Sequence, residues 1–339
     1  MKFLSLLAAA SRTRAFLRGS SASAAFLLFL SCVAPVSSDR PALSGRPAKG
    51  DQTKGARAFL WEIKSPTATA YLFGSIHLGD KSLYPLRPEI LSAFQKAGVM
   101  GVEARTDKAP EVQRRLFMLT FRYGFYRGDR TLRDDLSRED FALLKKVAAK
   151  SKMPVERMER MKPWLAALTL SLMQVQKKGK LKVQYGIEHY FHRENKKLQK
   201  PKEIIELEGA EFQVKLFGTL ALPKQVLFLR YTLQDIDGKA ADPKTEGQSI
   251  RDMVAAYKRG DAKFFQKNFL DGYFKKKKYE FLYRLIFVDR NRGMARKIET
   301  LLEKKKTYFL IIGALHLVGE KSIIEFLRRS GKKYSIRRL

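Results

Sequence analysis

Two matching segments contain the residues best suited to chemistry in this chain. Gly74-Ser75-Ile76-His77 and Gly313-Ala314-Leu315-His316 each place a glycine three residues before a histidine, and the 339 residues include only 4 histidines. Each segment follows an apolar, β-like run, at 71–73 and 308–312. A strand of this kind delivers an imidazole to the carboxyl edge of a sheet, where open α/β folds place their sites. Two such histidines facing one cleft would form a metal site or an acid–base pair.

Two glutamates occupy comparable positions. Glu103 ends the apolar run 98–103, and Glu208 ends the run 203–208. An acid that terminates an apolar strand is a less common placement than an acid on a helix surface. The structural alternative for Glu103 is an ion pair with a neighbour such as Arg105.

These residue types point to a metal-activated water. Two neutral imidazoles and a carboxylate are the usual ligands of a catalytic zinc that keeps one position for water. Manganese, cobalt or iron(II) would accept the same ligands. We expect His77, His316 and Glu103 to hold the metal, with Glu103 alternatively acting as general base. Glu208 would serve as a base or would orient a ligand. The structural alternative for both histidines is a hydrogen-bonded core position.

Other constellations are weaker. His189 and His192 lie one helical turn apart, but their spacing of three is not that of a zincin, so we interpret them as surface or boundary residues. Ser75 is close to His77, yet no Gly-x-Ser-x-Gly elbow is present. Glycine-rich phosphate loops are also absent from the sequence.

Apolar periodicity predicts an α/β fold: a mixed, mainly parallel sheet flanked by helices. Two strand–Gly-x-x-His–helix units at the ends enclose a helical insert at 110–200. Strands are predicted at 59–63, 70–73, 98–103, 203–208, 307–312 and 334–337. Helices are predicted at 88–97, 110–127, 138–151, 163–177, 186–199, 210–219, 223–235, 249–259, 261–271, 279–304 and 319–330.

The N-terminus has the features of an export signal. Residues 1–38 contain four basic and no acidic residues, an apolar run at 24–30 and small residues at 36–38. This order is that of a secretory signal peptide, although an organellar transit peptide shares the composition. We expect a periplasmic or secreted protein. Cys32, the only cysteine, stands in a poor lipobox, which argues against a lipid anchor.

The chain is strongly basic. Its formal net charge is +33, and without the four basic residues of 1–38 it would still carry 63 Lys and Arg against 34 Asp and Glu. Residues 39–57 are rich in Pro, Gly and basic residues and are expected to form a flexible linker. The charge would attract a polyanion such as an anionic envelope surface, or would simply solvate helix faces. No signature of base readout is present, so a specific nucleic-acid partner is not expected.

With these residues laid out, the chain resembles the TraB/GumN family, which includes the Tiki metalloproteases. The match covers residues from about 59 to the C-terminus, as a single domain over 58–339. The order and spacing of the matching pieces are specific, whereas any one of them is weak. They are 72–79, 84–86, Val102-Glu103, 162–164, Gly186-Ile187-Glu188, Phe191, 206–208, Gln213, Gln225, Arg290-Asn291, Met294 and 311–319.

The resemblance implies that both Gly-x-x-His motifs and the early glutamate converge on one site. Without the resemblance, Arg290 and Asn291 would be interpreted as part of a charged helix surface. The resemblance favours a role in the site, in which Arg290 pairs with a carboxylate or oxyanion and Asn291 forms a hydrogen bond. The family often has Asp where this chain has Glu188, which puts the geometry there in doubt.

The Tiki members look like divalent-metal-dependent peptidases. The sequence therefore predicts an exported divalent-metal-dependent hydrolase that acts on peptides or proteins, with Mn, Co or Zn as cofactor. The alternative is a non-catalytic envelope protein that binds a peptide or polyanion in the same cleft.

Overall fold

The computed structural model describes residues 58–339 except 106–108, 180, 239–251 and 275–278. The predicted export signal, the linker and the lysine cluster at 275–278 therefore lie outside the described residues. The centre of the fold is a six-stranded sheet in the order β4-β3-β5-β2-β1-β6. Its strands are β1 (Leu60–Lys64), β2 (Thr69–Ser75), β3 (Val99–Val102), β4 (Glu203–Glu206), β5 (Thr307–Gly313) and β6 (Ser335–Arg338).

Four neighbouring strands are parallel. β3 pairs with β4 on one side and β5 on the other, and β5 pairs with β2, all in parallel register. β1 runs antiparallel to both β2 and β6. The predicted fold, a mixed and mainly parallel sheet flanked by helices, is confirmed. The carboxyl ends of β4, β3, β5 and β2 consequently lie along one edge.

Aromatic packing covers one face of the sheet. Phe94 of α3 (Pro88–Lys96) and Phe191 of α8 (Ile187–Lys197) both contact Phe309 of β5, edge-on at 5.5 Å and tilted at 4.8 Å between ring centroids. Phe191 also meets Phe73 of β2 edge-on at 5.9 Å. Burying these rings removes a large apolar area from water. The position of α8 is thereby fixed against the strands that carry both Gly-x-x-His motifs.

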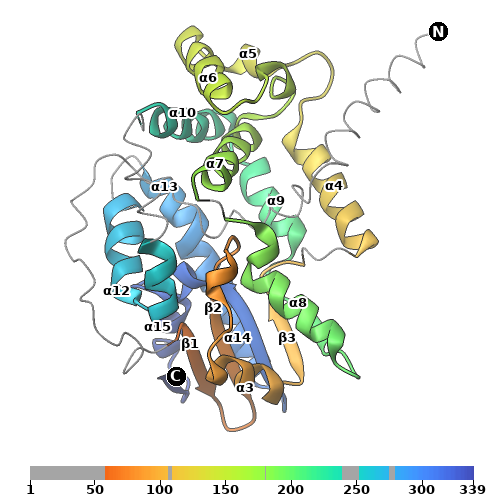
Figure 1. Cartoon of the computed structure of the whole chain (residues 1–339), viewed down its shortest axis with the longest axis vertical. Helices are drawn as coiled ribbons and strands as arrows, with labels where there is room; N and C mark the ends of the chain where they lie inside the picture. The colour runs from red at the N-terminus through yellow and green to blue at the C-terminus, as the bar shows by residue number, and fades with distance from the viewer. Residues whose placement is uncertain (1–57, 106–108, 180, 239–251, 275–278) are drawn as a thin grey trace.

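Apart from α8, the helices between residues 110 and 238 form a second region beyond the carboxyl edge (Figure 1). Proline at the first turn begins α4 (Pro110–Gly124) and α7 (Pro163–Gly179), and Ser137 caps α6 (Arg138–Lys150) by accepting from the Asp140 N–H at 3.1 Å. Within the described part, no helix has both the length and the hydropathy needed to cross a membrane. This region consists of α4 (Pro110–Gly124), α5 (Leu132–Asp135), α6 (Arg138–Lys150), α7 (Pro163–Gly179), α9 (Ala210–Gly218) and α10 (Leu222–Gly238).

The helices near the C-terminus depart from the expected periodicity. The predicted helix 261–271 begins as α12 (Ala262–Phe265) and continues as a π-helical segment, Gln266–Phe274. The predicted helix 279–304 consists of α13 (Glu280–Tyr283), a π-helical segment, Arg284–Val288, and α14 (Asp289–Leu302). The chain closes with α15 (Ile323–Arg328) and β6. Single π turns within helices are frequent at functional sites.

Acid stability should depend on an ion pair in β1. Glu62, whose side chain is 6% exposed, accepts from Arg337 Nε at 2.6 Å and lies 3.3 Å from Lys64 Nζ. Burial works against its charge, but the two cations lower the pKa of Glu62 below its usual value. A lowered folded-state pKa stabilises the fold above the unfolded value of about 4.3, and this contribution is lost as the pH falls through the folded value.

We therefore expect Glu62→Gln to have a lower melting temperature than wild type near neutral pH. On acidification, the melting temperature of the variant should fall by less than that of wild type. Thermal melts of both proteins between about pH 6 and about pH 3 measure the difference. Parallel curves would show that Glu62 titrates normally in the folded protein.

Candidate functional site

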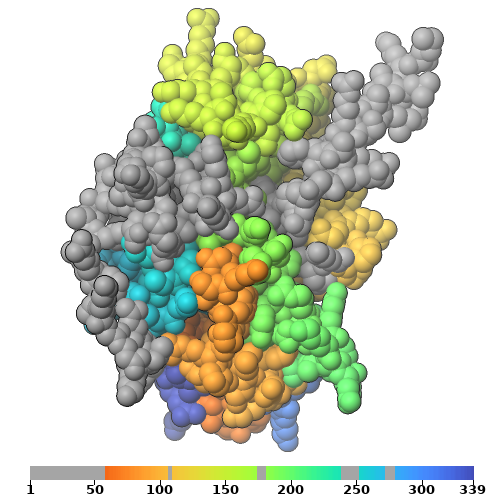
Figure 2. All heavy atoms as spheres, in the orientation of Figure 1, coloured from red at the N-terminus to blue at the C-terminus, as the bar shows by residue number. Residues whose placement is uncertain are grey.

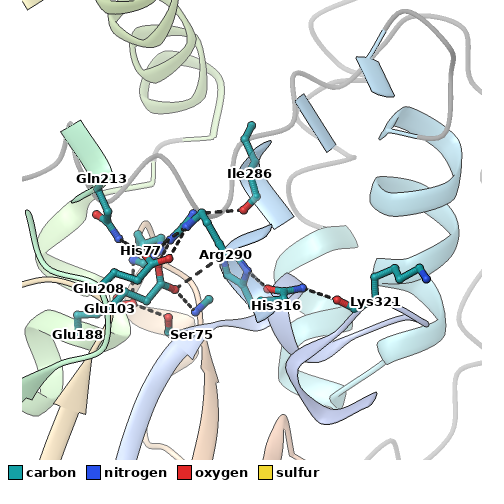
Figure 3. Close-up of polar contacts among 12 residues, drawn as sticks. Ser75, His77, Glu103, Glu188, Glu208, Gln213, Ile286, Arg290, His316 and Lys321 are labelled. Atoms are coloured by element: carbon teal, nitrogen blue, oxygen red, sulfur yellow. Dashed lines mark hydrogen bonds and ion pairs between the residues drawn. The ribbon is translucent and has the colours of Figure 1, made fainter. Parts of the chain in front are cut away.

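Four side chains meet at the carboxyl edge of the sheet. Glu208, Glu103, His316 and His77 follow β4, β3, β5 and β2, the four neighbouring parallel strands. Figure 3 shows them gathered around Arg290 of α14. His316 has no exposed surface, His77 and Glu103 are 6% exposed, and the Glu208 side chain is 5% exposed. Residues more than 230 positions apart in the sequence are thus buried together.

Glu103 is fixed at both carboxylate oxygens. Oε2 accepts from Arg290 Nη2 at 2.6 Å, and Oε1 accepts from the Gly313 N–H at 2.7 Å. Its main-chain oxygen accepts from the N–H groups of Glu208 and Gly209, both at 2.9 Å. The ends of three neighbouring strands are therefore joined through this one residue.

Arg290 joins the two glutamates. Its Nε donates to Glu208 Oε1 at 3.0 Å, its Nη2 donates to Glu208 Oε2 at 2.7 Å, and its Nη1 donates to the Ile286 oxygen at 3.4 Å. Gln213 Nε2 adds contacts to Glu208 at 3.1 Å and to Glu103 at 3.3 Å. All three guanidinium nitrogens therefore donate within the protein, which suits a residue that positions carboxylates.

The network keeps its groups charged. Burial alone would raise the pKa of Glu103, but Arg290, then the two histidines and the Gly313 N–H, lower it to about 2. Burial opposes the charge of Arg290 as well, yet Glu208 and Glu103 raise its pKa above the usual value. Around neutral pH, Glu103 is a carboxylate and Arg290 is a cation.

The protonated nitrogen of His316 follows from its neighbours. Asn291 Nδ2 donates to the Lys321 main-chain oxygen at 2.7 Å, which can only accept, so Asn291 turns its Oδ1 toward His316 Nδ1 at 2.5 Å. Nδ1 therefore carries the hydrogen and Nε2 carries a lone pair. Burial, and then the charge of Arg290, lower the pKa of His316 to about 3. The ring is neutral at physiological pH.

His77 has a similar arrangement on the other side of the site. Its Nδ1 lies 2.8 Å from Glu188 Oε1, which also accepts from the Ser75 hydroxyl. Burial opposes the charge of Glu188, but His77 and Ser75 lower the pKa of this carboxyl below its usual value. A carboxylate at Nδ1 favours a hydrogen on that nitrogen and turns Nε2 to the opposite side of the ring.

A glycine sets the position of Glu188. A Cβ built on Gly186 would lie only 2.3 Å from the main-chain oxygen of His77, a backbone atom that cannot move aside cheaply. The next residue, Ile187, donates its N–H to the Ile76 oxygen at 3.1 Å. The start of α8 is therefore held directly against the turn that carries His77, which brings Glu188 to the imidazole despite its extra methylene relative to Asp.

Some of the nitrogen and oxygen atoms at this site are suitable ligands for a divalent metal ion. Each buried imidazole has Nδ1 close to an oxygen, at 2.5 Å from Asn291 for His316 and at 2.8 Å from Glu188 for His77. Nε2 of His316 has no hydrogen-bond partner among the described residues. It lies 4.0 Å from Glu103 Oε1, within the roughly 4.2 Å that two ligands of one ion can span. Across the residues that the structure describes, however, no group of three or more His, Cys, Asp or Glu side chains is already arranged around one point.

The structure thus gathers every residue predicted for the site: His77, His316, Glu103, Glu208, Arg290 and Asn291. The interpretation of His192 as a surface or boundary residue is wrong, because it is 6% exposed within α8. That helix packs its inner face on the sheet, whereas His189 is half-buried.

The sequence assigns no role to three residues that contribute to the site. Glu188 stands out only as a departure from the family pattern, and Gln213 only as a matching residue. Tyr257, in the helical stretch 252–259, donates its hydroxyl to the Gly74 oxygen at 2.6 Å and supports the first motif. No local pattern around Tyr257 indicates this contact.

Comparison with known proteins places the chain among relatives. It is 26% identical to the uncharacterized protein YbaP of Shigella flexneri over 76% of this chain and 88% of the relative, and to YbaP of Escherichia coli (strain K12) over 76% and 87%. A segment of 62 residues is 42% identical to a metalloprotease TIKI homolog of Amphimedon queenslandica, covering 18% of this chain and 12% of that protein. No solved structure matches the chain. The model of the TraB/PrgY/gumN family matches residues 59–336, and the chain therefore belongs to this family.

Proposed function

We propose that this protein is a divalent-metal-dependent hydrolase that cleaves peptide bonds. The observation that carries the proposal is the shared orientation of the two histidines. In each ring Nδ1 faces an oxygen, of Glu188 or Asn291, which turns Nε2 to the other side of the ring within a buried site. Nε2 of His316 has no hydrogen-bond partner among the described residues. Metal-binding histidines characteristically have such a partner on the other ring nitrogen. The partial similarity to a metalloprotease TIKI homolog agrees with the reaction type.

His77 and His316 would hold the ion through Nε2, and Glu103 through Oε1. A bound divalent ion would lower the pKa of its water toward about 7 and polarise a carbonyl. Of the two roles open to Glu103, we assign that of ligand, because a carboxyl with a pKa of about 2 is a weak proton acceptor at neutral pH.

The remaining residues position this set. Arg290 orients Glu103 and Glu208, since its three nitrogens are all engaged within the protein and leave little capacity for an oxyanion. Gln213 bridges the same two carboxylates. Asn291 and Glu188 hold the tautomers of His316 and His77. Burial of the whole group strengthens each of these interactions.

Metal content tests the proposal. Wild type, His77→Ala, His316→Ala and the control His189→Ala are purified without chelator or histidine tag and incubated with Mn²⁺, Co²⁺ or Zn²⁺. Elemental analysis should find stoichiometric metal in wild type and His189→Ala and none in the two site variants. A peptide library screened with the retained metal should then be cleaved by the same two proteins.

The opposite result would be wild type without stoichiometric metal under any condition. It would exclude the metal-dependent hydrolase and leave the binder of peptides or polyanions, with its basic surface, as the leading account. This experiment tests the proposed activity and metal. Localisation of the protein tests the proposed export.

A further inference from the structure

Helix α4 carries an apolar stripe on each of two opposite sides. Val112 and Leu116 face the protein interior and are buried. Phe117, Met118 and Phe121 recur at the same helical spacing on the other side, because residues three and four apart lie on one face of a helix. A surface helix normally has polar residues there. We name the outward residues Arg114, Phe117, Met118 and Phe121 the α4 ridge.

Two apolar side chains of the α4 ridge are strongly exposed, and the third, Phe117, is half-buried. Met118 is 58% and Phe121 is 56% exposed, and the Phe121 ring stacks between those of Phe117 and Phe125 at 6.2 and 5.9 Å. In the described part of the chain, the only other large apolar side chain with comparable exposure is Phe212, at 45%, on the adjacent helix α9. Concentration of such residues in one place marks an interaction surface.

The surroundings of the ridge are basic. Arg114, Arg115 and Arg122 of α4 are exposed. The nearby acids are Glu111 in the first turn, Glu206 at 4.0 Å from Arg115, and Glu211 of α9, which pairs with Lys215. A second copy of a chain with a net charge of +33 would bring like charges together, which disfavours self-association through this face. The partner should therefore be anionic and should accept aromatic and thioether side chains.

Shape separates a bilayer from an acidic peptide. Side chains that are more than half exposed stand out from the surface and do not line a groove that could enclose a peptide. Figure 2 shows α4, in gold, at the margin of the molecule. A helix face that combines phenylalanine with arginine is typical of helices that lie in the interface of an anionic membrane.

We infer that the α4 ridge binds the surface of an anionic lipid bilayer, with Met118 and Phe121 entering the headgroup boundary and the arginines contacting lipid phosphates. The binding orients the protein with α4 toward the membrane. This inference does not depend on the proposed hydrolase activity.

A local reporter tests the contact within the full chain. An environment-sensitive dye is attached to Met118→Cys or, as control, to Lys304→Cys, each in a Cys32→Ser background. Lys304 precedes β5 and so lies at the opposite edge of the sheet from the strand ends that lead to α4. Phosphatidylglycerol vesicles should shift the emission of the dye at 118 to the blue and leave that at 304 unchanged; phosphatidylcholine vesicles should change neither. Equal shifts, or no shift at 118, would overturn the inference.

Co-sedimentation with phosphatidylglycerol vesicles compares the binding of matched variants. Arg114→Ala with Arg122→Ala should lower the partition coefficient by about tenfold or more at low salt, whereas Lys304→Ala with Lys305→Ala, which removes the same charge, should have a smaller effect. Met118→Ser with Phe121→Ser should reduce the binding that persists at high salt. If the serine variant binds like wild type, or if it instead dissolves a dimer seen by sedimentation velocity, the ridge does not bind a bilayer.

Discussion

Arg290→Met is expected to lower the free energy of unfolding by about 3–5 kcal/mol, because it leaves two buried carboxylates without their cation. Arg290 has 1% of its surface exposed and donates to both Glu103 and Glu208. Methionine restores much of the volume, so the loss would come from uncompensated charge and not from a cavity. Denaturant unfolding at neutral pH, followed by circular dichroism, measures it.

The same substitution at Arg230 is the matched control. Arg230 also forms a forked pair with one carboxylate, donating to Asp140 at 2.7–3.0 Å, but its side chain is 41% exposed. Arg230→Met should cost less, about 1–3 kcal/mol, because it leaves one carboxylate without its cation and not two, and Asp140 is 9% exposed. Similar losses in the two variants would mean that the Arg290 network is not sealed from solvent.

Glu103→Gln is expected to reduce turnover of a cleaved peptide by at least about 100-fold and to weaken metal binding by a comparable factor. Changes to outer groups around a metal already cost about 10–100-fold, and this change removes a proposed ligand charge. The amide has nearly the same shape, and its oxygen can still accept from the Gly313 N–H. Steady-state kinetics and metal titration of the same preparation separate the two effects.

Glu62→Gln is the control for this variant. Glu62 is also buried and ion-paired on a strand of the same sheet, but it pairs with Arg337 and lies outside the site. Its turnover and metal affinity should equal those of wild type. If Glu103→Gln retained metal affinity while losing turnover, Glu103 would be a base and not a ligand, and the alternative role for this residue would be favoured.

The strand ends were predictable because their causes are local. Runs such as 71–73 and 308–312 are apolar and end at glycine, and a parallel sheet brings such ends to one edge. That reasoning placed His77 and His316 together. The same reasoning does not predict the contacts of Glu188 with Ser75 and of Gln213 with Glu103, because these partners lie 113 and 110 positions apart in the sequence. Pairings of this kind depend on how α8 and α9 dock, which no periodicity encodes.

The π-helical segments were missed for a related reason. A widened turn preserves the apolar stripe over one or two turns, so the residues before α14 fit an ordinary helix. The segment Arg284–Val288 matters for the site, because the Ile286 oxygen accepts from Arg290 Nη1.

The position of β5 between β3 and β2 determines at which point of synthesis the sheet and its candidate site can assemble. A ribosome that has released the chain only as far as 306 has supplied β1 with β2 and β3 with β4, two strand pairs with nothing between them. His77 and Glu103 then belong to separate halves, and the Gly313 N–H that holds Glu103 does not yet exist. The two halves are joined only when β5 has been synthesised and has paired with β3 on one side and β2 on the other. A chain that ends before β5 would therefore lack His316 and the Gly313 N–H, and its candidate site could not assemble.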